Sequence, residues 1–202
     1  MRAPCLQIAV LGWLAVFTSG CGGDSFVHTA PGCTPLSPPT AAYVVNNSLN
    51  TISMYTVNSC TGALTATNPP TVTSGTAGGA PHTVVVAPSG KFAHVSNQVD
   101  GTVSMYSVNS STGVLTPTTP PTIATGTFPL GLTVDPSGKF VYVANDTASE
   151  VSMYTINSST GNLTPTTSPT VATGAGPQGI AVDPSGEFVY VPQELPMSAL
   201  TA

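Results

Sequence analysis

The sequence predicts an all-β protein made of β-propeller blades, each a sheet of four antiparallel strands. Three observations support this: a repeat of about 48 residues over positions 41–191, four strand-like segments in each repeat, and prolines concentrated in one of the four. The repeats supply about three to three and a half blades. We therefore expect an open, incomplete ring, because closed propellers need about four to eight blades.

Two motifs establish the repeat. Pro-Ser-Gly, followed by Lys or Glu and then Phe, begins at Pro88, Pro136 and Pro184, so both spacings are 48 residues. Ser-Met-Tyr begins at Ser53, Ser104 and Ser152, with spacings of 51 and 48. The three extra residues lie in the segment 75–81. A further column of the repeat contains Tyr43, His94, Tyr142 and Tyr190.

Each unit divides into four strands. The first is short, as in residues 179–183, and Asp183-Pro184-Ser185-Gly186 suits a type I turn with Pro second and Gly fourth. The second strand, 140–144, is apolar on both faces, as expected of a strand between neighbouring sheets. The third covers 151–157. The fourth, 163–173, is rich in Thr and Pro.

The prolines place the fourth strand at the outside of each blade. Proline cannot donate a hydrogen bond to a neighbouring strand, so it belongs on a sheet edge. The prolines of the fourth strands are Pro69, Pro70, Pro117, Pro120, Pro121, Pro165 and Pro169. Gly131 and Gly179 fall in the first strand, where blades crowd the axis. A sheet with a tight inner strand and a free outer one is a propeller blade.

The segments Gly-Ile-Ala-Val-Asp-Pro-Ser-Gly-Glu-Phe-Val-Tyr-Val (179–191) and Phe-Val-Tyr-Val-Ala-Asn (140–145) resemble the YVTN-type repeats of the seven-bladed lactonase-like β-propellers. The resemblance covers about residues 41–191. It implies the propeller fold and one enzymatic activity, hydrolysis of a sugar lactone such as 6-phosphogluconolactone. Such repeats also occur in surface and binding proteins, so fold alone does not assign an activity. The chain reads as a C-terminally truncated member of this family.

Lactonases of that family typically carry Pro-Arg-His at the start of an inner strand. The corresponding segments here are 81–83 (Pro-His-Thr), 129–131 (Pro-Leu-Gly) and 177–179 (Pro-Gln-Gly), so neither the arginine nor the histidine column is kept. We therefore assign no catalytic residue and favour a binding or scaffold module of the cell envelope with an unknown ligand or protein partner. The alternative is a lactone hydrolase whose essential residues lie in blades that this chain lacks.

His82 is the candidate binding residue. It begins an inner strand near a propeller mouth, where it can act as a ligand contact or general base; the alternative is simple variation of a rim residue. We expect His94 to be a partly buried substitute for the tyrosines of its column. Asp135 and Asp183 could form a carboxylate pair, but each precedes Pro-Ser-Gly, where Asp caps a turn.

The sequence carries no cofactor-binding or metal-binding motif in the context that such a motif requires. Residues 174–179 match G-x-G-x-x-G, but that pattern binds dinucleotides only between a strand and a helix, and here it precedes a strand and contains Pro177. The sequence has no H-E-x-x-H, Cys-x-x-Cys or EF-hand spacing. We expect no cofactor and no metal.

The N-terminus reads as an export signal. Residues 1–20 combine Arg2, an apolar run over 6–17 and small residues before Cys21, and the run is too short to span a bilayer. Residues 18–23 resemble a lipobox, which makes Cys21 the lipidation site at the head of a Pro-rich leader (21–40). We expect anchoring in the bacterial outer membrane or periplasm; ordinary signal cleavage and secretion is the alternative. Residues 192–202 form a non-repeat tail.

Cys5 leaves with the signal, and the two remaining cysteines, Cys33 and Cys60, suit a disulfide in an exported protein. Cys60 replaces Ser111 and Ser159 at the tip of an exposed turn. A Cys33–Cys60 bridge would join the leader to the first blade and contribute roughly 3–4 kcal/mol in the loop-entropy account. Two free thiols are the alternative.

Charge excludes nucleic acid as a partner. The full chain has a net charge of −5, and it becomes more negative once Arg2 leaves with the signal, which leaves Lys91 and Lys139 as the only cations. Phosphate backbones and anionic membrane surfaces require clustered Lys and Arg. Membrane contact is therefore expected through the lipid anchor alone. An incomplete ring also leaves apolar blade faces open, so we expect self-association through the open blade edge.

Overall fold

The computed structural model describes residues 8–10, 34, 36 and 40–193. The strands are β1 (Ile8–Val10), β2 (Thr40–Asn46), β3 (Thr51–Val57), β4 (Leu64–Thr73), β5 (Pro81–Val86), β6 (Phe92–Asn97), β7 (Thr102–Val108), β8 (Leu115–Ala124), β9 (Pro129–Val134), β10 (Phe140–Asn145), β11 (Glu150–Ile156), β12 (Leu163–Ala172), β13 (Ala181–Val182) and β14 (Val189–Tyr190). One turn of 3-10 helix, η1 (Asn47–Leu49), separates β2 from β3.

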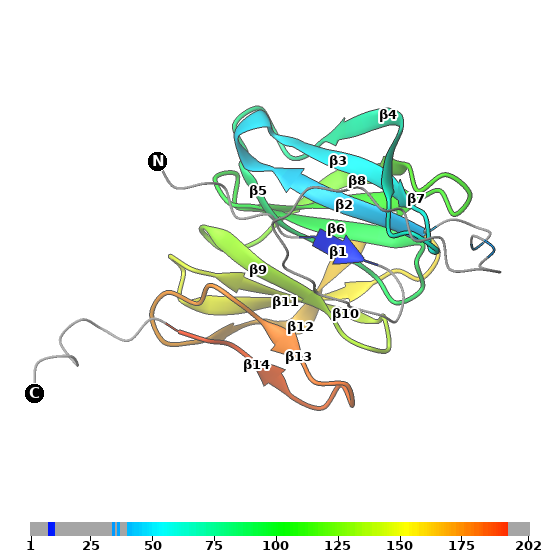
Figure 1. The fold of residues 1–202 in the computed structure, drawn as a ribbon. Coiled ribbons are helices and arrows are strands. Elements are labelled where there is room, and N and C mark those ends of the chain that lie inside the picture. Colours follow the sequence, from blue (N-terminus) through cyan, green and yellow to red (C-terminus); the bar gives the residue numbers. More distant parts are fainter. Residues whose placement is uncertain (1–7, 11–33, 35, 37–39, 194–202) are drawn as a thin grey trace, which may run out of the picture.

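The strands form three antiparallel four-stranded sheets, β1–β4, β5–β8 and β9–β12, and one hairpin, β13–β14. Figure 1 shows the sheets following one another along the chain, with the C-terminal hairpin after the third. The inner strands β5 and β9 lie beside each other. Within the described residues the sheets do not close into a ring. The predicted all-β architecture of propeller blades in an open arc is confirmed.

The order of strands within each sheet follows from their side chains. The second strand of the second sheet, β6, is buried along its whole length, because sheets pack on both of its faces. The fourth strand, β8, is mostly exposed and lies at the sheet edge. The equivalent strands β4 and β12 are also mostly exposed and lie at edges. The Pro-rich strands are therefore the outer ones, as predicted.

The first sheet contains one strand more than predicted. Strand β1 pairs antiparallel with β2, with Ile8 opposite Val44 and Val10 opposite Ala42. The repeat predicts only three strands for this first unit, because residues 8–10 fall inside the apolar run interpreted as an export signal. A short apolar run is compatible with both an export signal and a β-strand. Cleavage after residue 20 stays a prediction; it would remove β1 and leave the inner edge of β2 without this partner.

Two apolar clusters join the three sheets. The first lies between the first and second sheets and includes Tyr43, Met54, Tyr106 and Leu115. The second lies between the second and third sheets and includes Met105, Val143, Tyr154 and Leu163. Full burial of one such side chain contributes about 1.5–3 kcal/mol, so these clusters are the main force holding blade on blade.

Three polar contacts recur at each junction. Between the first two sheets, the Tyr43 hydroxyl donates to the Gly113 carbonyl (2.7 Å), the Leu115 amide donates to the Met54 sulfur (3.2 Å), and the Tyr106 hydroxyl donates to the Thr73 carbonyl (2.7 Å). These contacts satisfy polar groups that the apolar cluster would otherwise bury unpaired.

The second junction repeats this pattern with one substitution. Nε2 of His94 lies 2.9 Å from the Gly161 carbonyl, the Leu163 amide donates to the Met105 sulfur (3.1 Å), and the Tyr154 hydroxyl donates to the Ala124 carbonyl (2.8 Å). Gly113 and Gly161 occupy the same place in the turn that precedes the fourth strand.

An Asn–Ser network closes the ends of the second and third strands. In the second sheet the buried Asn97 amide donates to the Ser104 hydroxyl (2.9 Å), and its carbonyl oxygen accepts from Ser74 (2.8 Å). The three extra residues of this repeat lie in the adjoining loop, where both the amide and the hydroxyl of Thr76 donate to Asp100 (2.6 and 2.7 Å). Asp100 therefore holds the insertion together with the backbone amides of Gln98 and Val99, which donate to the Ala80 and Gly79 carbonyls (both 3.0 Å).

Candidate site at the inner-strand entrance

His82 lies at the start of β5, the inner strand of the second sheet. Its Nδ1 is 3.2 Å from the Thr83 hydroxyl, and the ring is hydrogen-bonded to the backbone of Leu130, at the start of the neighbouring inner strand β9. Burial lowers the pKa of His82, and the Leu130 bond opposes that shift only in part. The imidazole is therefore neutral at pH 7 and half-buried, a state that can accept a proton or bind a neutral ligand.

The loops around His82 come from three sheets. The Asn47 side chain donates to the Pro81 carbonyl (3.3 Å), which brings η1 against the start of β5. The backbone amide of Asp146 donates to the Phe128 carbonyl (3.0 Å) at the start of β9. Phe128 adopts a left-handed backbone (φ 62°) and is exposed. We call this end of the sheets, where the inner strands begin, the inner-strand entrance.

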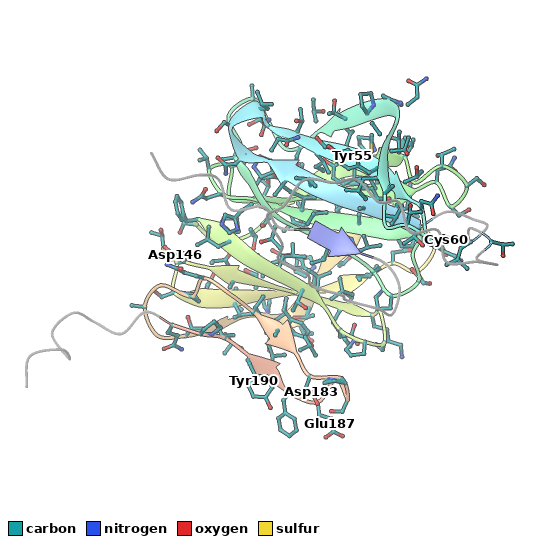
Figure 2. All side chains as sticks on the ribbon, in the orientation of Figure 1. Tyr55, Cys60, Asp146, Asp183, Glu187 and Tyr190 are labelled. Atoms are coloured by element: carbon teal, nitrogen blue, oxygen red, sulfur yellow. The ribbon has the colours of Figure 1, made fainter. Side chains whose placement is uncertain are left out.

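The inner-strand entrance carries no lysine or arginine among residues 40–193. Lys91 and Lys139 lie in the turns between first and second strands, at the opposite strand ends from His82. Figure 2 shows the same separation: Asp146 lies beside the start of β9, and Glu187, in the turn column of the lysines, lies at the far tip of the C-terminal hairpin.

Carboxylates dominate the charge of the inner-strand entrance. Asp100, Asp146 and Glu150 all lie where the second strands end and the third strands begin. Asp100 already accepts two hydrogen bonds from Thr76. An acidic surface without a cation repels phosphorylated ligands and lacks the Arg or Lys contacts that hold phosphate. The surface therefore suits an uncharged ligand.

The aspartates of the Pro-Ser-Gly turns have the structural role that the sequence predicts. Asp135 accepts hydrogen bonds from the amides of Ser137 (3.0 Å), Lys139 (2.8 Å) and Phe140 (2.7 Å). Burial alone would raise the pKa of Asp135, but these bonds outweigh it and hold the pKa below its ordinary value. In Asp183 the side-chain bond from Ser185 and the amide of Phe188 lower the pKa in the same way. Both carboxylates therefore cap their own turns.

His94 is more deeply buried than predicted. Its side chain is fully inaccessible, and Nδ1 has no hydrogen-bond partner in the described part of the chain. Burial lowers the pKa of His94 to about 4, despite the opposing hydrogen bond to Gly161. His94 is a packing residue and does not reach the inner-strand entrance.

The cysteine predictions fall mostly outside the described residues. Cys60 is disulfide-bonded. Cys33, its predicted partner, and Cys21, the predicted lipidation site, lie outside the described range, so both assignments stay predictions. In Figure 2 Cys60 lies at the tip of the turn between β3 and β4, near the edge of the first sheet.

Sequence reasoning located His82 but missed its neighbours. The contact with Leu130 crosses from one sheet to the next and has no local signal. The charge separation could have been found, because the repeat already assigns every Lys and Asp to a strand end. Residues 174–179, which match G-x-G-x-x-G, fall in the loop leading to β13.

Neither a metal cluster nor a membrane-spanning helix occurs within the described ranges. No group of three or more His, Cys, Asp or Glu side chains there could hold a metal ion. No described helix has the length and apolarity needed to cross a membrane.

The repeated four-stranded sheets, with inner strands side by side and Pro-rich strands at the outer edges, define the chain as part of a multi-blade β-propeller. The family model described as "Lactonase, 7-bladed beta-propeller" matches residues 36–174, more than half of the chain. The chain therefore belongs to the lactonase family of seven-bladed β-propellers. No curated protein matches the sequence.

Solved structures share the fold at low sequence identity. A putative 6-phosphogluconolactonase from Bacteroides fragilis is 22% identical, with a TM-score of 0.64 over 76% of this chain and 44% of its own. The periplasmic gluconolactonase PpgL of Pseudomonas aeruginosa is 18% identical, with a TM-score of 0.60 over 75% of this chain and 43% of its own. Hydrazine synthase of Kuenenia stuttgartiensis also matches, at 19% identity and a TM-score of 0.56 over 87% of this chain and 45% of that one. The matched part spans less than half the length of these structures.

Proposed function

We propose that the inner-strand entrance binds an uncharged sugar lactone, and that His82 contacts it. The observation that carries the proposal is the charge pattern: three carboxylates and no cation among the described residues at the end where His82 lies. A phosphorylated lactone would meet repulsion there and no clamp. Membership of the lactonase family supports a lactone as the ligand class.

His82 supplies a neutral imidazole beside a backbone hydrogen bond. Such a group can accept a hydrogen bond from a sugar hydroxyl or take a proton from an attacking water. The described residues offer no second group placed to share that step, so hydrolysis would draw on residues outside them. The proposed function is therefore first the binding of the lactone and second its hydrolysis. The envelope scaffold role predicted from the sequence gains no support from any described feature.

The test compares two lactones that differ only in phosphate. Glucono-δ-lactone and its 6-phosphate are titrated into the purified full chain, with binding followed by calorimetry and acid release by pH-stat above the spontaneous rate. We expect the neutral lactone to bind at least about tenfold more tightly, a difference of about 1.4 kcal/mol. His82→Ala should weaken binding at least tenfold, and Lys91→Ala, at the opposite strand ends, should leave it unchanged. Preference for the phosphate, or an unaffected His82→Ala, would refute the proposal.

The location proposed for this function is the exported side of a bacterial membrane, with Cys21 as the lipid anchor. The disulfide at Cys60 supports export, because disulfides persist in oxidising compartments. Cells expressing the chain are labelled with a fatty acid, and Cys21→Ser should abolish labelling and leave the larger precursor. Cys60→Ser is the matched control, which should still be labelled. Labelling of Cys21→Ser would exclude the anchor.

A further inference from the structure

The residue before the proline that opens each inner-strand segment has a left-handed backbone. In successive units this residue is Ala80 (φ 51°), Phe128 (φ 62°) and Gly176 (φ 63°). In the first two, its carbonyl accepts a hydrogen bond from the loop between the second and third strands. The Gln98 amide donates to Ala80, and the Asp146 amide donates to Phe128 (both 3.0 Å). The repeat therefore requires this backbone shape, which does not depend on a large side chain.

Phe128 is the bulkiest of the three residues and the least suited to this conformation. A left-handed backbone brings Cβ close to the following carbonyl oxygen, a strain that glycine avoids and that is unusual for a bulky residue. Burial offsets this strain only in part, because Phe128 is 39% exposed. Strained residues of this kind concentrate at binding and catalytic sites. The fold alone therefore gives no reason for an aromatic ring at this position.

Phe128 lies at the inner-strand entrance, two residues before Leu130, whose backbone is hydrogen-bonded to the His82 ring. On the other side of β9, a Cβ added at Gly131 would lie 3.0 Å from the backbone of residues 178–179. Inner-strand segments therefore flank the start of β9 on both sides. The exposure of Phe128 comes from its place at the entrance, beside the candidate binding residue.

We propose that Phe128 is the platform on which the closed sugar ring stacks, an inference that rests on the proposed lactone-binding function. The face of an aromatic ring is electronegative, and the C–H bonds along one face of a sugar ring end in weakly positive hydrogens that pack on it. Small-molecule sites combine such apolar contacts with a few polar groups that fix orientation. Phe128 supplies the apolar contact, and His82 supplies the polar one.

The platform and the carboxylates together separate a lactone from its hydrolysis product. In hydrolysis the water oxygen bonds to the acyl carbon, the acyl C–O bond breaks and a proton goes to the ring oxygen. The ring opens, and the resulting carboxylic acid is ionised at pH 7. The open chain presents no C–H face to Phe128, and its charge is repelled by Asp146 and Glu150. Stacking therefore selects the closed, uncharged ring, and the opened acid is the form that leaves.

The experiment titrates freshly dissolved glucono-δ-lactone, and separately gluconate, into the purified full chain. Calorimetry measures binding, and proton NMR measures the upfield shift that an aromatic face causes in the sugar C–H resonances. We expect gluconate to bind at least about tenfold more weakly than the lactone. Phe128→Leu keeps the apolar bulk and removes the aromatic face, so it should weaken lactone binding about fivefold and abolish the upfield shift.

Three further variants separate stacking from folding. Phe128→Tyr keeps the aromatic face and should retain most of the binding and the upfield shift. Phe128→Gly introduces the residue found at the equivalent position 176, so it should fold, as judged by circular dichroism, and lose binding as Phe128→Leu does. Phe140→Ala is the matched control, because Phe140 is 37% exposed but lies at the opposite strand ends. It should bind the lactone as the wild type does.

The outcomes distinguish this inference from the proposed function. Lactone binding that depends on His82 but is unchanged in Phe128→Leu and Phe128→Gly would overturn the stacking and leave the proposed function standing. Equal binding of lactone and gluconate would overturn the selection of the closed ring. Absence of lactone binding would refute the proposed function and the stacking with it.

Discussion

The junction between the first and second sheets and the junction between the second and third enclose the same turn glycine with different residues. In the first, a small Ala41 and a large Tyr43 face Gly113. In the second, a large Phe92 and a smaller His94 face Gly161. What is kept is one hydrogen bond to the glycine carbonyl, whereas the larger of the two side chains stands in a different column at each junction. Paired columns of a repeat therefore have to be considered together.

The largest expected effect tests whether the glycine is required by the neighbouring sheet. A Cβ added at Gly161 would overlap the buried Phe92 ring, and the position also has a left-handed backbone (φ 76°). Gly161→Ala should cost about 4 kcal/mol, from overpacking together with backbone strain. Gly62→Ala has the same backbone (φ 70°) and open space, so it should cost only about 1 kcal/mol. Urea unfolding measures both, and equal losses would show that packing is not the cause.

Acid should weaken the second junction and spare the first. The folded chain holds His94 neutral, with a pKa of about 4 against 6.5 in the unfolded chain, so the unfolded chain binds the proton first as pH falls. This stabilisation is complete above about pH 7 and declines between pH 6.5 and 4, by about 3 kcal/mol in all. His94→Tyr should remove that slope, since Tyr43 does not titrate in this range.

The control for the acid experiment is Asp135. Its lowered pKa places its own loss of stability at lower pH, as the carboxylate becomes protonated below its ordinary range. Asp135→Asn should therefore leave the slope between pH 6.5 and 4 intact. A slope that survives His94→Tyr would assign it to another group.

The exchange of large and small side chains between the two columns can be tested by converting the second junction to the first. Phe92→Ala leaves a cavity and His94→Tyr overfills its site, so each alone should destabilise the fold. Together they recreate the Ala41–Tyr43 arrangement, and the double variant should recover about 2 kcal/mol relative to the sum of the singles. Thermal unfolding of all four proteins measures the coupling; strict additivity would refute the compensation.

The smallest effect concerns a single hydroxyl. Tyr106 donates to the Thr73 carbonyl across the first junction, so Tyr106→Phe should cost about 1 kcal/mol. Tyr55 holds the same column in the first sheet, where its hydroxyl makes no such bond within the described residues, so Tyr55→Phe should leave monomer stability within about 0.5 kcal/mol of wild type. Equal costs would mean that Tyr55 is already covered in solution.

Much of the fold was predictable because its causes are local and repeated. Proline excludes a strand from the sheet interior, and Asp before Pro-Ser-Gly caps its own turn. The positions of residues such as Pro120 and Asp135 in the fold can therefore be predicted from the sequence. Strand β1 was not predictable, since three apolar residues within residues 6–17 fit a signal and a strand equally well. His82 could be placed at a strand start, but its bond to Leu130 depends on how two sheets stack. His94 was recognised as a substitute, and the compensating Phe92 two residues earlier was visible in the same columns.

The contacts that recur at both sheet–sheet junctions have a consequence for how such a chain can lengthen during evolution. Each 48-residue unit carries a Tyr-or-His and Met on the side of its successor, and a Gly, Leu and Tyr on the side of its predecessor. A tandem duplication of the coding segment for one unit would therefore insert a blade whose two faces already fit its neighbours. Compensating pairs such as Phe92 with His94 then let the copies diverge without losing that fit. Copy number and sequence can drift separately, which is how weakly similar repeats persist within one architecture.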